Sequence, residues 1–370
     1  MAGGSGTRLW PASSSRLPKQ FLPAAKADAS AKTGEAGGKK SFFSLAVERA
    51  LAVTAGKVII ITGKSHIPHV IADAAKLSAD KKKRLLVIGE PAAKNTAPAI
   101  ACAVVYSQLS GGGGNMLVIT SDHIIEPLKT FKSDAALAVV GAKNGKLVVF
   151  GIPPARPETG YGYIETGKAE AGVYEVTAFH EKPDLQTAEK YAASGRFYWN
   201  SGMFAFSAAF MTGQFHSLAP DVFRCFEKLK VPAPSAYKKI QGIRVLNSWQ
   251  GLDAAYRKTK SISFDYAIAE KCTASAMIRS NFNWIDIGNW EEYAKVRGSN
   301  SAQVFSVSSE NCFVDSDIPV ALAGVEDLIV VIRSGKNGSP ASALITKKGQ
   351  TQKVRNIVEQ IKKSGKTDIL

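Results

Sequence analysis

The stretch LLVIGEPAAKNTAPAIACAVVYSQL (Leu85 to Leu109) contains both kinds of element from which the fold is built. Its first five residues form a continuous apolar run, which is typical of a strand buried on both faces of a parallel sheet. Its second half predicts a helix over Ala97 to Gln108, with Pro98 in the first turn. Asn95 and Thr96 supply the cap signal at the start of that helix. A buried strand followed by a capped helix indicates an α/β fold.

The alternation of apolar runs and helical segments extends outward from this stretch. Buried strands are predicted at three further apolar runs: VIIIT (Val58 to Thr62), MLVIT (Met116 to Thr120) and LVVFG (Leu147 to Gly151). Phe42 to Ala52 predicts a second helix. Together these elements predict a Rossmann-like α/β fold with a mixed, mostly parallel sheet flanked by helices. Ligands of such sheets collect at the carboxyl ends of the strands, so motifs that follow a strand are candidate site residues.

The composition of the chain changes after Tyr293. Short β-rich runs separated by turns occupy Ser301 to Val331, and an amphipathic helix is predicted over Thr351 to Lys363. We therefore predict a catalytic α/β domain over residues 1–298 and a small β-rich domain over residues 299–370 that ends in a helix.

The overall composition is that of an ordinary globular protein. Of the 370 residues, 45% are hydrophobic and 21% are charged, which excludes disordered and fibrous classes. The four cysteines lack the Cys-x-x-Cys spacing of a zinc site and predict buried free thiols. No apolar run reaches the ~18 residues that cross a bilayer, and no signal-peptide pattern opens the chain. We expect a cytoplasmic protein without a membrane partner.

A formal net charge of +16 suggests affinity for polyanions. Much of the excess lies in short lysine-rich runs that contain no interleaved aromatic residues, unlike a platform that stacks single-stranded bases. These runs are interpreted as solvated faces, so no specific nucleic-acid partner is expected. Weak, non-specific attraction to polyanions stays open.

The first residues, MAGGSGTRLWPASSSRLPKQF, predict a phosphate-binding loop. Glycines without a Cβ allow backbone N–H groups to approach a polyphosphate closely, and Arg8 and Lys19 supply cations beside them. The spacing is not that of a P-loop, because no Gly-Lys-Ser/Thr follows. The predicted loop residues are Gly3, Gly4, Ser5, Gly6 and Thr7.

The longer pattern Gly-Gly-x-Gly-x-Arg-Leu-x-Pro, followed by Pro-Lys, resembles the signature of the sugar-phosphate nucleotidyltransferases. Further motifs, in the same order along nearly the whole chain, resemble the mannose-1-phosphate guanylyltransferases, also called GDP-mannose pyrophosphorylases. They are GEPAAKNTAPAI (89–100), SDHII (121–125), GIPPARPETGYGYIETG (151–167), FHEKP (179–183), WNSGMF (199–204), NWIDIGNW (283–290), GVEDLIVV (324–331) and QKVRNIVEQI (352–361).

The resemblance implies that GMP is transferred from GTP to mannose 1-phosphate, giving GDP-mannose and pyrophosphate with Mg²⁺ as cofactor. The attacking phosphate oxygen is already ionised, so the protein must supply positioning and charge neutralisation rather than a strong base. The resemblance also implies a left-handed β-helix-like C-terminal domain and suggests a homodimer. Two alternatives stay open: a sister enzyme with another base or hexose, and a non-catalytic paralogue that binds a sugar nucleotide and regulates a partner.

Four residues are expected to carry the catalysis. Arg8 and Lys19 are suited to hold the triphosphate and stabilise charge on the leaving pyrophosphate. Asp122, at the end of a predicted strand, and Asp286, in a later turn, are candidate carboxylate ligands for Mg²⁺, and Asp122 matches the family's metal-binding position. The alternative for each aspartate is a structural turn cap.

The residues of the sugar-phosphate site are assigned from the same resemblance, whereas those for guanine follow from its need for an acceptor. Lys182 is expected to bind the phosphate of the sugar, whereas Gly162, Glu181 and Asn200 are expected to contact its hydroxyls. A surface ion pair or a structural turn is the alternative for these residues. The guanine base is assigned to Glu90, Asn95 and Thr96, with a purely structural helix cap as the alternative for the last two.

This chain departs from the family pattern at two places near its start. The glycine loop of the family follows a buried apolar strand, whereas only Met1 and Ala2 precede Gly3 here. We expect the first strand of the sheet to be missing and the stability to be reduced. The stretch Ala24 to Lys40, rich in Ala, Lys and Gly, is longer than the usual link and is expected to be inserted or flexible.

Overall fold

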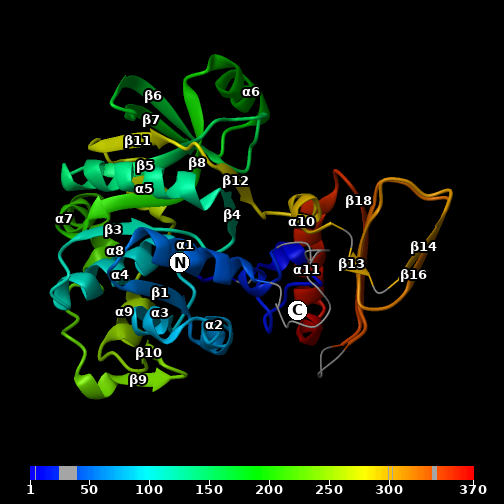
Figure 1. Ribbon diagram of the computed structural model, residues 1–370, viewed down its shortest axis with the longest axis horizontal. Helices are drawn as coiled ribbons and strands as arrows, with labels where there is room; N and C mark the ends of the chain where they lie inside the picture. Colours follow the sequence, from blue (N-terminus) through cyan, green and yellow to red (C-terminus); the bar gives the residue numbers. More distant parts are fainter. Residues whose placement is uncertain (5, 25–39, 299, 302, 336–339) are drawn as a thin grey trace. The chain divides into compact units, whose positions relative to one another are not determined.

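The computed structural model describes residues 1–4, 6–24, 40–298, 300–301, 303–335 and 340–370 (Figure 1). These residues form two compact units. The first comprises residues 1–3, 46–120 and 125–284, and the second comprises residues 4–45, 121–124 and 285–370. The predicted domain boundary after residue 298 stays a prediction. Most of the Ala24 to Lys40 stretch lies outside the described residues.

A four-stranded sheet of the first unit has the order β1-β2-β10-β9. Its strands are β1 (Val58–Gly63), β2 (Leu85–Glu90), β10 (Ile243–Leu246) and β9 (Tyr237–Ile240). β1, β2 and β10 are parallel, and β9 pairs with β10 antiparallel. Every residue of β2 is buried, as the continuous apolar run predicts for a central parallel strand.

The second sheet of this unit is mixed and has the order β3-β8-β5-β11-β7-β6. Its strands are β3 (Asn115–Val118), β8 (Phe197–Ser207), β5 (Leu147–Ile152), β11 (Ser275–Arg279), β7 (Val173–Glu181) and β6 (Gly162–Glu170). β5 and β11 are parallel, whereas β8 runs antiparallel to three neighbours. The two residues Ala171 and Gly172 join β6 to β7 and both have positive φ, which matches the twist of a tight hairpin.

Helices flank both sheets of the first unit (Figure 1). They are α1 (Phe42–Val53, which begins in the second unit), α2 (Ile67–Ala74), α3 (Ala79–Lys83), α4 (Thr96–Leu109), α5 (Leu128–Lys143), α6 (Leu185–Ser194), α7 (Ala208–Leu218), α8 (Pro220–Phe223) and α9 (Leu252–Lys258). α4 is buried continuously from Ala97 to Tyr106, so it is a core helix rather than a surface one. The expected α/β architecture is thereby confirmed, but the strand predicted as buried over Met116 to Thr120 is β3, which ends at Val118 and is mostly only half-buried because it lies at the edge of its sheet. Among the described residues, no helix is long and apolar enough to cross a bilayer.

The first unit contains a cavity of about 870 Å³ at the facing edges of the two sheets. β1 and β3 line it together with small residues of α4 and α5. At one end the Met1 amino group donates to the carbonyl of Ile119 at 2.7 Å, and the Ala2 amide donates to Ile61 at 2.8 Å. The Thr62 hydroxyl donates back to the Ala2 carbonyl. The first two residues therefore bridge the two edges at one end of the cavity.

The C-terminal part of the second unit consists of short parallel strands. β13 (Asn300–Ser301), β15 (Phe313–Ser316) and β17 (Leu328–Arg333) are stacked in parallel, and β18 (Ser342–Lys347) closes their sheet. β14 (Val304–Val307) and β16 (Val320–Ala323) form a second parallel pair. Successive parallel pairs of this kind are those of a coiled β-helix, in agreement with the expected β-rich domain.

The core of the second unit contains residues from near the start of the chain and from its C-terminal end. Trp290 opens α10 (Trp290–Arg297) and is fully buried, and its indole N–H donates to the carbonyl of Trp10. Trp10 in turn donates to the carbonyl of Ile369 at 2.7 Å. The buried Val358 of α11 (Val354–Lys363) belongs to the same apolar cluster. The glycine loop from Gly4 onward thus packs in one unit with the C-terminal helix.

Candidate active site

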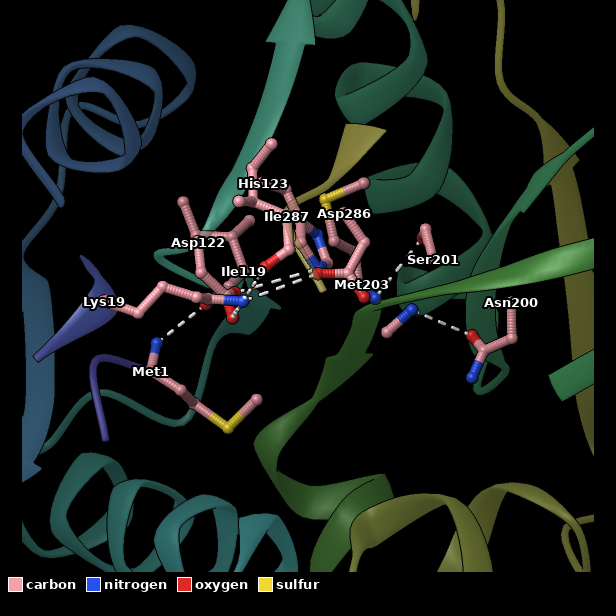
Figure 2. Close-up of polar contacts among 11 residues, drawn as sticks. Met1, Lys19, Ile119, Asp122, His123, Asn200, Ser201, Met203, Asp286 and Ile287 are labelled. Atoms are coloured by element: carbon pink, nitrogen blue, oxygen red, sulfur yellow. Dashed lines mark hydrogen bonds and ion pairs between the residues drawn. The ribbon is translucent and has the colours of Figure 1, made fainter. Parts of the chain in front are cut away.

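A lysine and two aspartates meet in the second unit (Figure 2). The Lys19 ammonium lies 2.8 Å from Asp122 Oδ2 and 3.7 Å from Asp286 Oδ1. It also donates to the carbonyl of Ile287 at 2.6 Å. Three of the four predicted catalytic residues are therefore brought together although they are far apart in the sequence.

Local structure explains why these side chains converge. Asp122 directly precedes β4 (His123–Glu126), and Asp286 ends β12 (Asn283–Asp286), which pairs with β4. Lys19 begins the short helix η2 (Lys19–Phe21). Gly6 has φ of 61°, and a Cβ at this position would collide with the side chain of Lys19. Glycine is thus required where the loop passes the lysine.

Charge pairing outweighs burial in this cluster. Burial alone would lower the pKa of Lys19, but the carboxylates of Asp122 and Asp286 raise it above its ordinary value. For Asp122, burial favours the neutral form, but Lys19 and His123 hold its pKa well below the usual range. The side chain of Asp122 is 33% exposed and that of Lys19 is 12% exposed. The Asp122 carboxylate is therefore ionised, and it is partly accessible to solvent.

The fourth predicted catalytic residue, Arg8, is exposed and lies beside this cluster. A Cβ at Gly288 would lie 3.8 Å from Arg8 Nη1 and 3.6 Å from Asp286 Oδ2, so the guanidinium and this carboxylate flank the same glycine. The charge of Arg8 also acts on Lys19 and opposes the rise of its pKa. Two cations therefore accompany the two carboxylates.

His123 is a member of the cluster that the sequence did not reveal. Its Nε2 lies 3.7 Å from Asp122 Oδ1 and 3.8 Å from Asp286 Oδ1, and its side chain is buried. The histidines show no ligand spacing in the sequence. The available signal was the position of His123 directly after Asp122 in the Ser-Asp-His motif.

The predicted phosphate loop is divided between the two units. Gly3 belongs to the first unit, whereas Gly4 and the residues after it belong to the second. Ser5 lies outside the described residues. Gly4 has φ of 95°, and Thr7 begins the short helix η1 (Thr7–Leu9). Phosphate binding by these residues stays a prediction.

Glu90 ends β2 as a buried carboxyl group. The Tyr256 hydroxyl donates to its Oε1 at 3.1 Å, and a Cβ at Gly3 would lie 3.2 Å from its Oε2. Burial raises the pKa of Glu90 to about 7, although Tyr256 and the N-terminal amino group act in the opposite direction. An acceptor thus lies beside the first glycine of the predicted loop.

Asn95 and Thr96 make the hydrogen bonds of a helix start. The Thr96 amide donates to Asn95 Oδ1 at 2.9 Å, so Asn95 caps α4 as its sequence position predicts. Thr96 Oγ1 accepts from the amide of Phe264 at 2.7 Å. Both side chains therefore have structural partners, and their assignment to guanine stays a prediction.

The four residues assigned to the sugar phosphate lie together in the first unit. Gly162 of β6 pairs with Glu181 of β7, and a Cβ at Gly162 would lie 2.5 Å from Glu181 Oε2. The Glu181 carboxylate therefore lies directly against Gly162 and would have to shift if a larger residue stood there. The Lys182 ammonium forms an ion pair with Glu181 Oε1. Asn200 lies on the neighbouring strand β8.

Asp265 is a second residue that the sequence analysis missed. Asn200 Nδ2 donates to Asp265 Oδ1 at 2.7 Å, and Asn200 Oδ1 accepts from the amide of Gly202, a bond that Figure 2 shows. Burial, and then the charge of Glu181, raise the pKa of Asp265. Asp265 stands in the segment SISFDYAIA, whose single acidic residue among apolar neighbours was the available signal.

Comparisons with known proteins agree with this arrangement. Residues 1–302 match the family model described as Nucleotidyl transferase, and residues 302–361 match that of the MannoseP isomerase/GMP-like beta-helix domain. The chain is 33% identical over 380 residues to the mannose-1-phosphate guanylyltransferase of Escherichia coli (strain K12), covering 99% of this chain and 73% of that protein. It is 32% identical over 375 residues to the xanthan biosynthesis protein XanB of Xanthomonas campestris pv. campestris (strain B100), covering 100% of this chain and 73% of the relative.

A solved structure extends the similarity to the whole fold. The structure described as mannose-1-phosphate geranyltransferase from Thermus thermophilus superposes with a TM-score of 0.78 at 27% identity and covers 98% of each chain. The α/β fold, the β-helix and the matched families thus agree along nearly the whole chain. This protein belongs to the nucleotidyltransferase family, among the relatives of the mannose-1-phosphate guanylyltransferases.

Proposed function

We propose that this protein transfers GMP from GTP to mannose 1-phosphate and releases pyrophosphate. The single observation that carries the proposal is the meeting of Lys19, Asp122 and Asp286, with Arg8 beside them, in a chain whose relatives are named mannose-1-phosphate guanylyltransferases. A buried, permanently charged lysine beside an exposed arginine suits a triphosphate, which develops charge on its leaving pyrophosphate.

The reaction needs no general base from the protein. The phosphate of mannose 1-phosphate carries the attacking oxygen as an anion, which attacks the α-phosphorus while the bond to pyrophosphate breaks. Arg8 and Lys19 hold the departing phosphates and offset their charge. Lys182, on the sugar side, supports the proposal because its ammonium is half exposed beside Glu181.

Asp122 and Asp286 fit a magnesium ion. Both carboxylates already face one cation, the Lys19 ammonium, and they present the oxygen ligands that Mg²⁺ prefers. Bound there, Mg²⁺ would neutralise charge on the triphosphate. Lys19 would then keep its bond to the Ile287 carbonyl and share the carboxylates with the ion.

Glu90 is the proposed acceptor for the guanine edge. An ionised carboxylate accepts from the two donors of that edge, and the pKa near 7 means that the ionised form is only half populated at neutral pH. Asn95 and Thr96 contribute by fixing the start of α4.

The test is pyrophosphate release by the purified protein with Mg²⁺. GTP and ATP are each offered with mannose 1-phosphate and with glucose 1-phosphate, and Asp286→Asn serves as the folded control that should lose turnover. Release confined to GTP with mannose 1-phosphate is expected. Preference for another pair would keep the mechanism and replace the substrates.

If no combination of nucleotide and sugar phosphate released pyrophosphate but the protein bound GDP-mannose in calorimetry, the enzymatic proposal would be overturned. A regulatory paralogue would then be favoured. The homodimer, the cytoplasmic location and the lack of a specific nucleic-acid partner stay predictions. Light scattering tests the first, cell fractionation the second, and retention on heparin at moderate salt the third.

A further inference from the structure

We infer that Asp265 is a positioning residue of the sugar site, which holds the Asn200 amide in the orientation that serves the sugar hydroxyls. The inference rests on the proposed function and deepens it, because it adds a residue that determines how the sugar phosphate is bound. It is carried by the hydrogen bonds at the two ends of the Asn200 side chain.

Asn200 is held at both ends of its amide group. Nδ2 donates to Asp265 Oδ1 at 2.7 Å, and Oδ1 accepts from the amide of Gly202 at 3.1 Å. An amide has two N–H donors and two acceptor positions on its oxygen, so these bonds to described residues leave one N–H and one acceptor position for a ligand. Asp265 Oδ1 is the acceptor of the bond from Nδ2, so Asp265 determines which end of the amide faces it.

Asp265 is itself fixed by the fold. It begins the π-helix η5 (Asp265–Ala269), in which its carbonyl accepts from the amide of Glu270 at 3.0 Å. The preceding residue, Phe264, is fully buried, and its amide donates to Thr96 Oγ1 at the start of α4. π-helical turns are rare and frequently occur at functional sites. The carboxylate is therefore presented from a rigid support.

The surroundings of Asp265 match a hydroxyl-rich ligand with one phosphate. Glu181 and Asp265 supply carboxylate acceptors, Asn200 supplies both a donor and an acceptor, and Lys182 supplies one cation. Burial and the charge of Glu181 both disfavour the ionised form of Asp265, so ionising this carboxyl group costs free energy. Its bond to Asn200 acts in the opposite direction and stabilises the charge.

The experiment is a double-substitution cycle on the full chain. Asp265→Ala, Asn200→Ala and the double variant are compared by KM for mannose 1-phosphate, KM for GTP and kcat. Asp265→Ala is expected to raise KM for mannose 1-phosphate by about 10- to 100-fold, the range of a hydrogen bond to a charged group, with KM for GTP unchanged. Because Asp265 acts through Asn200, the double variant is expected to match the more severe single variant.

Two further variants keep the inference falsifiable. Asp265→Asn retains an acceptor and a similar shape, so it is expected to recover part of the lost affinity even if the alanine variant folds poorly. Asp221→Asn, at an exposed aspartate paired with Lys260, is the matched control and should leave both KM values unchanged. Additive effects in the cycle, or equal changes in the two KM values, would overturn the inference.

Failure of the proposed function can be told apart from failure of this inference. Calorimetry measures the binding of mannose 1-phosphate to the unmodified protein and to the same variants without any turnover. Binding that weakens through Asp265 and Asn200 non-additively would support the positioning role even in a protein that releases no pyrophosphate. Binding that Asp265→Ala leaves unchanged would overturn it.

Discussion

Lys19 is held by the fold at the place where the proposed reaction needs a cation. Its ammonium is nearly buried, is held by two carboxylates and touches a backbone carbonyl. Burying a charge is costly unless it is paired, so the cluster is stable only as a set. The same pairing keeps the lysine protonated at any pH at which a triphosphate would bind.

Lys19→Gln is expected to lower kcat by about 100- to 1,000-fold, the effect of removing one preorganised donor from a transition state. The substitution also leaves Asp122 and Asp286 without their shared cation, so the melting temperature should fall. Lys64→Gln, at an exposed lysine that pairs with Asp253, is the control and should change neither quantity. A Lys19→Gln variant with normal kcat would remove Lys19 from the catalytic cluster.

Lys182→Ala is expected to raise KM for mannose 1-phosphate by at least about 10-fold, because a charge-assisted bond to the phosphate is lost. KM for GTP should stay the same. Lys190→Ala, at an exposed lysine of α6, provides the control. Steady-state kinetics with each substrate varied in turn would measure both constants, and equal effects on them would indicate a structural role.

Glu90 makes stability depend on pH. Its pKa is about 7 in the folded protein against an ordinary value of 4.5, so between these pH values the folded state binds more protons than the unfolded state. Stability should therefore fall as the pH rises through this window, by about 3 kcal/mol in total. Glu90→Gln removes this slope. Melting temperatures of both proteins from pH 4 to pH 8 measure it, and parallel curves would contradict the assignment.

At the scale of elements, the sequence predicted those strands and helices that local residue patterns determine. The buried strands β1, β2 and β5 and the capped helix α4 follow from apolar runs and cap residues. The antiparallel partners in the mixed sheet could not be read in this way, because the order of strands depends on contacts distant in sequence. The sequence analysis did not identify Asp265 for the same reason, because its partner Asn200 is 65 residues away in the sequence.

The start of α4 connects two elements of the first unit. Thr96 Oγ1 is the acceptor for the Phe264 amide directly before Asp265. Thr96→Val keeps the shape but removes the acceptor, so the free energy of unfolding should fall by about 1–3 kcal/mol. Urea titration measures this loss, and Thr96→Ser should restore most of the stability. A valine variant as stable as the original would show that the bond is not needed.

At the scale of the molecule, the two ends of the chain share one core. Trp10, Trp290 and Val358 pack in the cluster that supports Lys19, Asp122 and Asp286 within the second unit. Motifs placed at opposite ends of the sequence thus belong to one structural neighbourhood. The resemblance predicted that Lys19, Asp122 and Asp286 belong to one site, but their grouping in space depends on long-range packing that no local pattern encodes.

The cavity between β1 and β3 makes the protein sensitive to hydrostatic pressure. The cavity, of about 870 Å³, is partly open to solvent, and the imperfectly packed space at its walls is lost on unfolding, which rising pressure favours. A fused segment of about five Val and Ile residues before Met1 should raise the pressure of half-unfolding, whereas a Gly-Ser segment of equal length should not. Fluorescence of the native tryptophans under pressure would report both. Resistance to pressure would then distinguish the protein with the fused apolar segment from the protein without it.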